Sequence, residues 1–158
     1  MFDHALIFAE DLMTKDVATV HPETSLLVAV RLMAEKHVSG LPVVDADGKP
    51  VGMLTEGDLL RWHSEFSERQ QWWLDHLADG EPLAPSFLKV LQAERRKVAT
   101  IMSHEVVTIA RGTSAHDIAR LFQDKRIKRA PVVDDGRIVG LVSRSDLIKA
   151  MVRDLAKE

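Results

Sequence analysis

Two short segments place a hydroxyl group three residues before a carboxylate: Thr55 precedes Asp58, and Ser143 precedes Asp146. At the start of a helix this spacing matches a capping box, in which each cap contributes roughly 1 kcal/mol. A helix start also offers N–H groups and positive potential to a phosphate, and an ionised carboxylate can accept two hydrogen bonds from a diol. The spacing therefore predicts two helix caps and leaves open a second role in binding a sugar phosphate.

The sequence carries no other pattern of catalytic or metal-binding residues. The chain has no cysteine, which excludes disulfides and thiolate chemistry, and its seven histidines show no HxH or HExxH spacing. Neither a GxSxG motif nor a P-loop occurs, and no general acid, base or nucleophile is visibly set beside the two carboxylates. We therefore expect neither a metal site nor an enzymatic activity.

The two hydroxyl–carboxylate segments belong to an internal duplication of the chain. Residues 42–45 and 131–134 both read PVVD, and VGMLTEGDLL at 51–60 matches VGLVSRSDLI at 139–148. Two copies of a repeat are too few to form a solenoid. We therefore expect two units that bury their apolar faces against each other.

Each repeat predicts the order β-α-β-β-α. A strand over 17–20 or 106–109 leads to a hydroxyl pair that can cap a helix, and apolar runs around an Asp-Gly turn predict a hairpin. A second helix then begins at the hydroxyl of the capping box. The expected caps are Thr24, Ser25, Thr113 and Ser114, the expected turns are Asp47-Gly48 and Asp135-Gly136, and the expected core positions of the first helices are Leu26, Val30, Met33, Ala34, Ile118, Leu121 and Phe122.

Together these motifs carry a family resemblance. The LM and IM elements that open the repeats, GLPVVD and RAPVVD, and VGMLTEGDL and VGLVSRSDL resemble the cystathionine beta-synthase (CBS) domain, and their tandem pair resembles the regulatory Bateman module. The resemblance implies an α/β fold of two pseudo-symmetrically packed repeats, over 9–62 and 97–151. Residues 63–96 are expected to form a helical insertion, whose WWL element is similar to that of stand-alone bacterial CBS-pair proteins.

The resemblance also implies a ligand in the cleft between the repeats. This ligand would be an adenine nucleotide or another adenosyl compound: AMP, ADP, ATP, S-adenosylmethionine or NAD. In the family, the hydroxyl lies near the ribose or phosphate, the aspartate binds the ribose hydroxyls, and the backbone before the proline lines the base pocket. The residues implicated for ribose and phosphate are Thr55, Asp58, Ser143 and Asp146, and those implicated for the base pocket are Gly40, Leu41, Ala130, Asp11 and Thr100.

Basic residues distinguish the second candidate site from the first. Lys128 and Arg129 precede the second PVVD and Arg144 lies in the second capping box, whereas Glu56 stands at the matching position of the first. Because each charge-assisted bond to a phosphate is worth about 1.5–3 kcal/mol, we expect the second site to bind a nucleotide more tightly. A solvated cluster of cations at a helix end is the alternative interpretation.

Composition limits the classes of partner. A net charge of −3 and an apolar content of 46% describe a soluble globular protein that gives no reason to expect nucleic acid or an anionic membrane. Single-stranded nucleic acid on the basic second repeat is a third, separate hypothesis. Neither an apolar run of eighteen residues nor a basic N-terminal leader occurs, so we expect a cytoplasmic protein.

Two functions fit these features. The first is a regulatory module that senses an adenosyl ligand and passes its occupancy to an unidentified effector protein as a conformational change. The alternative is a ligand-free dimerising scaffold, and the resemblance implies pairing into a homodimer. The adjacent Trp72 and Trp73 point about 100° apart on a helix, so they either cover the module's own apolar surface or contact a partner.

Overall fold

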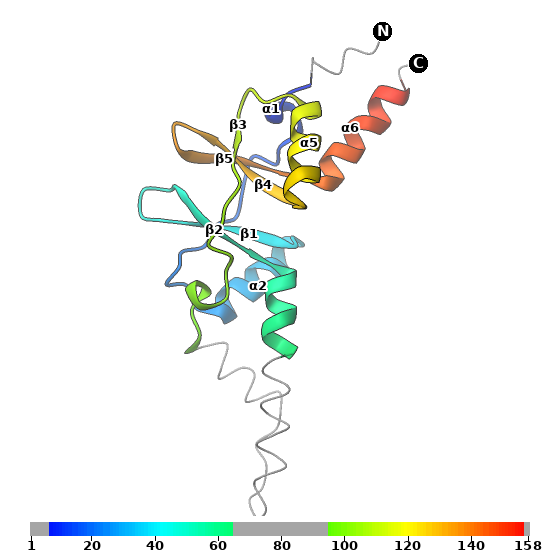
Figure 1. Ribbon diagram of the computed structural model, residues 1–158. Helices are drawn as coiled ribbons and strands as arrows, with labels where there is room; N and C mark the ends of the chain where they lie inside the picture. The colour runs from blue at the N-terminus through cyan, green and yellow to red at the C-terminus, as the bar shows by residue number, and fades with distance from the viewer. Residues whose placement is uncertain (1–6, 65–94, 157–158) are drawn as a thin grey trace, which may run out of the picture. The chain divides into compact units, whose positions relative to one another are not determined.

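The computed structural model describes residues 7–64 and 95–156, and the insertion expected over 63–96 lies almost entirely outside this range. Residues 56–64 are helical. In chain order the other elements, labelled in Figure 1 except for the 3₁₀ helix, are α1 (Ala9–Leu12), α2 (Leu26–Lys36), β1 (Gly40–Val44), β2 (Pro50–Thr55), a 3₁₀ helix (Val98–Thr100), β3 (Ile109–Ala110), α5 (Ala115–Lys125), β4 (Arg129–Asp134), β5 (Arg137–Ser143) and α6 (Arg144–Ala156).

The chain divides into two compact units, which we call unit 1 and unit 2. Unit 1 contains the chain up to residue 17, residues 46–50 and everything from residue 105 onwards. Unit 2 contains residues 18–45 and 51–104. Each unit has its own sheet, its own helices and its own apolar core, so the mixed α/β architecture predicted from the sequence is confirmed.

Unit 1 is built on the three-stranded sheet β3-β4-β5. Strand β3 runs parallel to β4, and β4 pairs antiparallel with β5 through a two-residue turn at Asp135-Gly136. Both turn residues have positive φ, 53° and 77°, as a tight turn that follows the twist of a hairpin requires. The predicted hairpin is therefore confirmed. Its core consists of Ala9, Leu12, Ile109, Ile118, Phe122, Ala130, Val132, Val142 and Ala150.

Unit 2 is built on the two-stranded sheet β1-β2, whose connection contains Gly48 at a φ of 81°. The strands expected over 17–20 and 106–109 are wrong in extent. The first is a single parallel bridge between Val20 and Val43, and the second is the two-residue strand β3. A high strand propensity is not sufficient here, because a strand extends only where backbone groups reach a partner. The core of unit 2 consists of Val20, Leu26, Ala29, Met33, Leu41, Val43, Leu54, Val98 and Met102.

The first helix of each repeat is capped as predicted. The Ser25 Oγ accepts a hydrogen bond from the Val28 N–H, and the Ser114 Oγ accepts one from the Asp117 N–H, both at 3.2 Å. Six of the seven predicted core positions are buried or pack against a core, but Ala34 is exposed and the prediction for it is wrong. The buried stripe of α2 runs through positions 26, 29, 30 and 33, which follows the 3.6-residue period more closely.

Each compact unit takes its first segment from the other sequence repeat. We call residues 7–14 and 96–103 the leading segments. Residues 7–14 pack in unit 1, where the Thr14 N–H donates to the Leu141 carbonyl (2.9 Å) and the Leu141 N–H donates to the Thr14 carbonyl (3.0 Å). Residues 96–103 pack in unit 2, where Ser103 and Met53 exchange a similar pair of bonds at 2.8 and 3.0 Å. The leading segments are thus exchanged between the repeats.

Within the described ranges, no helix combines the length and the apolar character that crossing a lipid bilayer requires.

Candidate functional site

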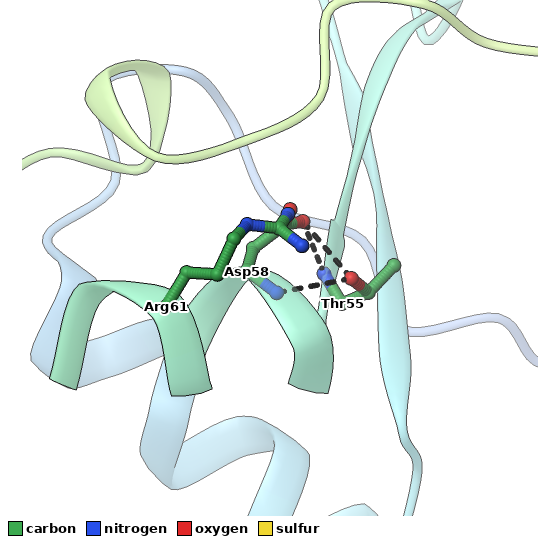
Figure 2. A network of polar contacts seen from close by, with 3 residues as sticks. All are labelled: Thr55, Asp58 and Arg61. Atoms are coloured by element: carbon green, nitrogen blue, oxygen red, sulfur yellow. Dashed lines mark hydrogen bonds and ion pairs between the residues drawn. The ribbon is translucent and has the colours of Figure 1, made fainter. Parts of the chain in front are cut away.

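The first hydroxyl–carboxylate pair lies at the junction between β2 and the helix over 56–64. The Oδ2 atom of Asp58 accepts hydrogen bonds from the Thr55 N–H (2.9 Å) and the Thr55 hydroxyl (3.0 Å), while the Asp58 N–H donates to the Thr55 Oγ1 (3.3 Å). Figure 2 shows this reciprocal network, which is the capping box predicted from the sequence. Asp58 is 5% exposed and is the one buried charged side chain among the described residues.

The other carboxylate oxygen of Asp58 is also engaged. The Nη2 atom of Arg61 donates to Oδ1 in an ion pair, so the guanidinium lies over the carboxylate (Figure 2). Arg61 itself is 71% exposed. Arg61 is not among the predicted binding residues, although a cation three residues after an acid on a helix is a known signal for such a pair.

The second pair lies at the junction between β5 and α6 and repeats the same geometry. The Oδ2 atom of Asp146 accepts from the Ser143 N–H (2.8 Å) and hydroxyl (3.0 Å), and the Asp146 N–H donates to the Ser143 Oγ (3.3 Å). The hydroxyl of Ser145 lies 3.0 Å from that of Ser143. The position that matches Arg61 holds Lys149, and within the described residues Asp146 has no ion-pair partner. Asp146 is half-buried.

With the leading segments exchanged, the predicted binding residues fall into two groups, one in each unit. Unit 2 holds Thr55, Asp58, Gly40, Leu41 and Thr100, and unit 1 holds Ser143, Asp146, Lys128, Arg129, Ala130 and Asp11. Each group therefore draws one residue, Thr100 or Asp11, from the repeat that does not supply its capping box.

Strand register brings the basic residues of unit 1 to the same end of the sheet as the capping box. Arg129 is directly opposite Ser143 in the β4–β5 ladder, and the Arg144 N–H donates to the Lys128 carbonyl at 2.9 Å. Neither Lys128 nor Arg144 has an ion-pair partner within the described residues. These cations are therefore close to Ser143 along the backbone, and two of them are available to an anion.

The residues expected around a base have local structural roles. The side chains of Leu41 and Ala130 are 1% and 0% exposed and belong to the two cores, so only their backbone can contact a ligand. Asp11 is exposed and accepts a hydrogen bond from the backbone N–H three residues earlier at 2.9 Å. Thr100 is exposed and donates to the carbonyl three residues earlier at 2.7 Å. Both polar side chains thus form hydrogen bonds within their own leading segment.

Unit 1 also contains an apolar hollow of about 260 Å³ between α5 and α6. None of the predicted binding residues lines it. At three of its positions the first repeat carries Leu26, Val30 and Trp62, which pack on the core of unit 2, where the second repeat has only alanine. The hollow is lined by Ile7, Ala115, His116, Ala119, Leu147, Ala150 and Met151.

In the described part of the chain, no group of three or more His, Asp or Glu side chains is arranged to hold a metal ion.

The family model described as CBS domain matches this chain twice, over residues 9–65 and 98–153. The chain belongs to the CBS domain family. Its tandem CBS pair, predicted from the sequence, is confirmed.

The CBS pair has relatives in archaea and plants. Protein MJ1426 of Methanocaldococcus jannaschii is 31% identical over 156 residues, covering 93% of this chain and 92% of the relative. The chloroplastic CBS domain-containing protein CBSX2 of Arabidopsis thaliana is 30% identical over 150 residues, covering 90% of this chain and 63% of the relative. This chain therefore spans less than two thirds of the length of CBSX2.

Solved structures share the fold. The crystal structure of CBSX2 in complex with AMP has a TM-score of 0.68 at 27% identity, and the match covers 93% of this chain and 97% of that one. The CBS domain of a CBS domain-containing membrane protein from Sphaerobacter thermophilus has a TM-score of 0.70 at 32% identity, covering 90% and 86% of the two chains.

Proposed function

We propose that this CBS pair is a regulatory module that binds an adenine nucleotide or another adenosyl ligand at its two capping boxes. The observation that carries the proposal is the reciprocal hydroxyl–carboxylate network, formed twice with matching distances at two helix starts. The complex of the relative CBSX2 with AMP supports the ligand class. Because a capping role alone requires no bound ligand, binding itself is the point to test.

The chemistry of the unit 1 site suits a ribose phosphate. The Oδ2 atom of Asp146 is used by the cap, whereas its Oδ1 atom has no ion-pair partner in the described structure and can accept hydrogen bonds from a diol. The N–H groups of Arg144 and Asp146 already have partners, so a phosphate would find fewer donors at the helix start and would depend more on the basic side chains. Lys128 and Arg144 supply these charges.

The charges beside the two capping boxes support a difference in affinity between the two sites. In unit 2, Glu56 stands where unit 1 has Arg144, and it places a negative charge beside the predicted phosphate position. Each lost charge-assisted contact is worth about 1.5–3 kcal/mol. We therefore expect AMP to bind the Ser143 site more tightly than the Thr55 site.

A ligand-free dimerising scaffold is the second candidate function, and one observation favours it. Helix α6 exposes Ile148, Met151 and Val152 at 56%, 62% and 59%, and Met151 lines the apolar hollow. Large apolar side chains next to an apolar hollow are typical of a protein contact surface. Light scattering would show a monomer if this face has no homodimeric role.

Binding of adenosyl ligands separates the two functions. Thermal unfolding would be followed with AMP, ADP, ATP, S-adenosylmethionine and NAD, since a ligand at 100 times its dissociation constant stabilises the native state by about 2.7 kcal/mol. Calorimetric titration of Asp58→Ala and Asp146→Ala would then assign the sites, and Asp146→Ala should lose the tighter one. If no compound shifts the unfolding temperature of the wild-type chain, the ligand-sensing proposal is wrong and the scaffold remains.

A further inference from the structure

The aspartates of the two capping boxes differ in one contact that the duplication does not repeat. In unit 2 the Arg61 guanidinium pairs with the Oδ1 atom of Asp58. In unit 1 the matching residue is Lys149, and within the described residues it forms no ion pair with Asp146. The three hydrogen bonds between the hydroxyl residue and the aspartate agree to within 0.1 Å in the two units. On the hydroxyl side, the Ser145 hydroxyl lies 3.0 Å from that of Ser143 in unit 1, where unit 2 has Gly57. Among the contacts of the aspartate, the difference is therefore confined to the carboxylate oxygen that the cap leaves unused.

That unused oxygen is the atom a ligand diol needs. Oδ2 of each aspartate already accepts two hydrogen bonds from the cap, so hydroxyl groups of a sugar depend on Oδ1. In unit 2 a guanidinium occupies this position over a carboxylate that is 5% exposed. A diol can bind there only after the charge-assisted contact to Arg61 is broken or shared. In unit 1 no such contact must be broken.

We propose that Arg61 closes the Thr55–Asp58 site to a ligand diol, so that the Ser143–Asp146 site fills first and residue 61 sets the ratio of the two affinities. This inference rests on the proposed function, since it concerns the same two sites. It differs from the effect of Glu56, because repulsion by Glu56 acts on a phosphate and closure by Arg61 acts on the sugar. Adenosine, which carries the diol without a phosphate, therefore isolates the role of Arg61.

Substitutions at the matching positions 61 and 149 test this role. The Ser143–Asp146 site, with its substitutions at position 149, serves as the control. Calorimetric titration with adenosine and with AMP would be performed on chains in which one site is removed by Asp146→Ala or Asp58→Ala. In the Asp146→Ala chain, Arg61→Ala should raise the affinity of the remaining site for both ligands about tenfold. In the Asp58→Ala chain, Lys149→Ala should change affinity less than twofold, and Lys149→Arg should lower it about tenfold.

Arg61 is 71% exposed, so its substitution should leave the fold intact, which circular dichroism and urea unfolding would verify for every chain. Arg61→Lys provides a second variant that keeps the positive charge but removes the planar fork. It should open the site to adenosine to a similar extent as alanine.

The outcomes distinguish this inference from the proposed function. If the wild-type chain binds AMP but Arg61→Ala leaves the affinity of the Thr55–Asp58 site for adenosine within twofold, the role of Arg61 is refuted and ligand binding stands. If neither AMP nor adenosine binds the wild-type chain or the Arg61→Ala chain, both proposals fail together. A tenfold gain at the first site with no change from Lys149→Ala supports closure by Arg61.

Discussion

Replacing Gly140 by alanine should displace the leading segment of unit 1. A Cβ atom at this position would lie 2.2 Å from the Sδ, 2.6 Å from the Cγ and 2.8 Å from the Cβ of Met13. The first two atoms can move by rotation of the side chain, but the Cβ of Met13 is fixed to its backbone. The segment around Met13 must therefore shift away from β5.

The cost of this shift follows from the contacts that hold the segment. Thr14 and Leu141 exchange two backbone hydrogen bonds at 2.9 and 3.0 Å, each worth about 1 kcal/mol net, and Met13 packs against the core of unit 1. Overpacking by one methyl group typically costs about 1–3 kcal/mol. We expect Gly140→Ala to lower the free energy of unfolding by about 3 kcal/mol, which corresponds to roughly 9 °C in a chain of this size.

Urea unfolding would measure the global effect, and hydrogen exchange would locate it. The Thr14 and Leu141 amides should exchange faster in Gly140→Ala, because both donate across the displaced contact. Gly112→Ala is the matched control, since a Cβ there meets nothing within 4 Å. In a Met13→Ala background, Gly140→Ala should cost less, because two of the three close atoms are then absent.

The reasoning would be refuted if Gly140→Ala unfolded within 0.5 kcal/mol of the Gly112→Ala control, with unchanged protection at Thr14 and Leu141. Such a result would mean that the leading segment adapts to an added methyl group without losing its pairing. Gly52→Ala offers an independent check in unit 2, where the new Cβ would lie 2.4 Å from the backbone carbonyl oxygen of Ser103.

Two further predictions concern the helix ends. His37 and Arg126 end α2 and α5 in the left-handed region at φ values of 54° and 55°, so His37→Gly and Arg126→Gly should each stabilise the chain by about 0.5–1 kcal/mol in urea unfolding; a loss of stability would contradict this. Removing the N-cap hydroxyls in Ser25→Ala and Ser114→Ala should each cost about 1 kcal/mol by the same measurement, whereas the cap contacts are unimportant if the cost stays below 0.3 kcal/mol.

Local features of the fold could be predicted from the sequence because their causes are local. The Asp135-Gly136 hairpin and the Ser25 and Ser114 caps depend on residues within a few positions of one another. Both capping boxes could be predicted for the same reason, because each joins residues only three positions apart. Ala34 is apolar but lies outside the buried stripe of α2, because the phase of the helix buries Ala29 instead.

Other features depend on contacts that spacing does not reveal. The pairing of Thr14 with Leu141 joins positions far apart in sequence, and no periodic pattern indicates that a leading segment packs in the other unit. Arg61 has no counterpart in the second repeat, where Lys149 stands, so the motifs that the repeats share do not indicate it. The proposed contrast between the two sites depends on Arg61 in one repeat and Lys149 in the other, a difference that lies outside the residues the repeats share.

The exchange of leading segments has a consequence for handling and engineering this protein. A fragment cut between the two repeats would lack the backbone partner of Leu141 or of Met53, and its sheet would end in an unsatisfied edge. At high concentration, two chains can exchange residues 7–14 and form the Thr14–Leu141 hydrogen bonds between chains. This exchange is the route to a domain-swapped oligomer. Fragments of this chain should therefore be made with both halves expressed together.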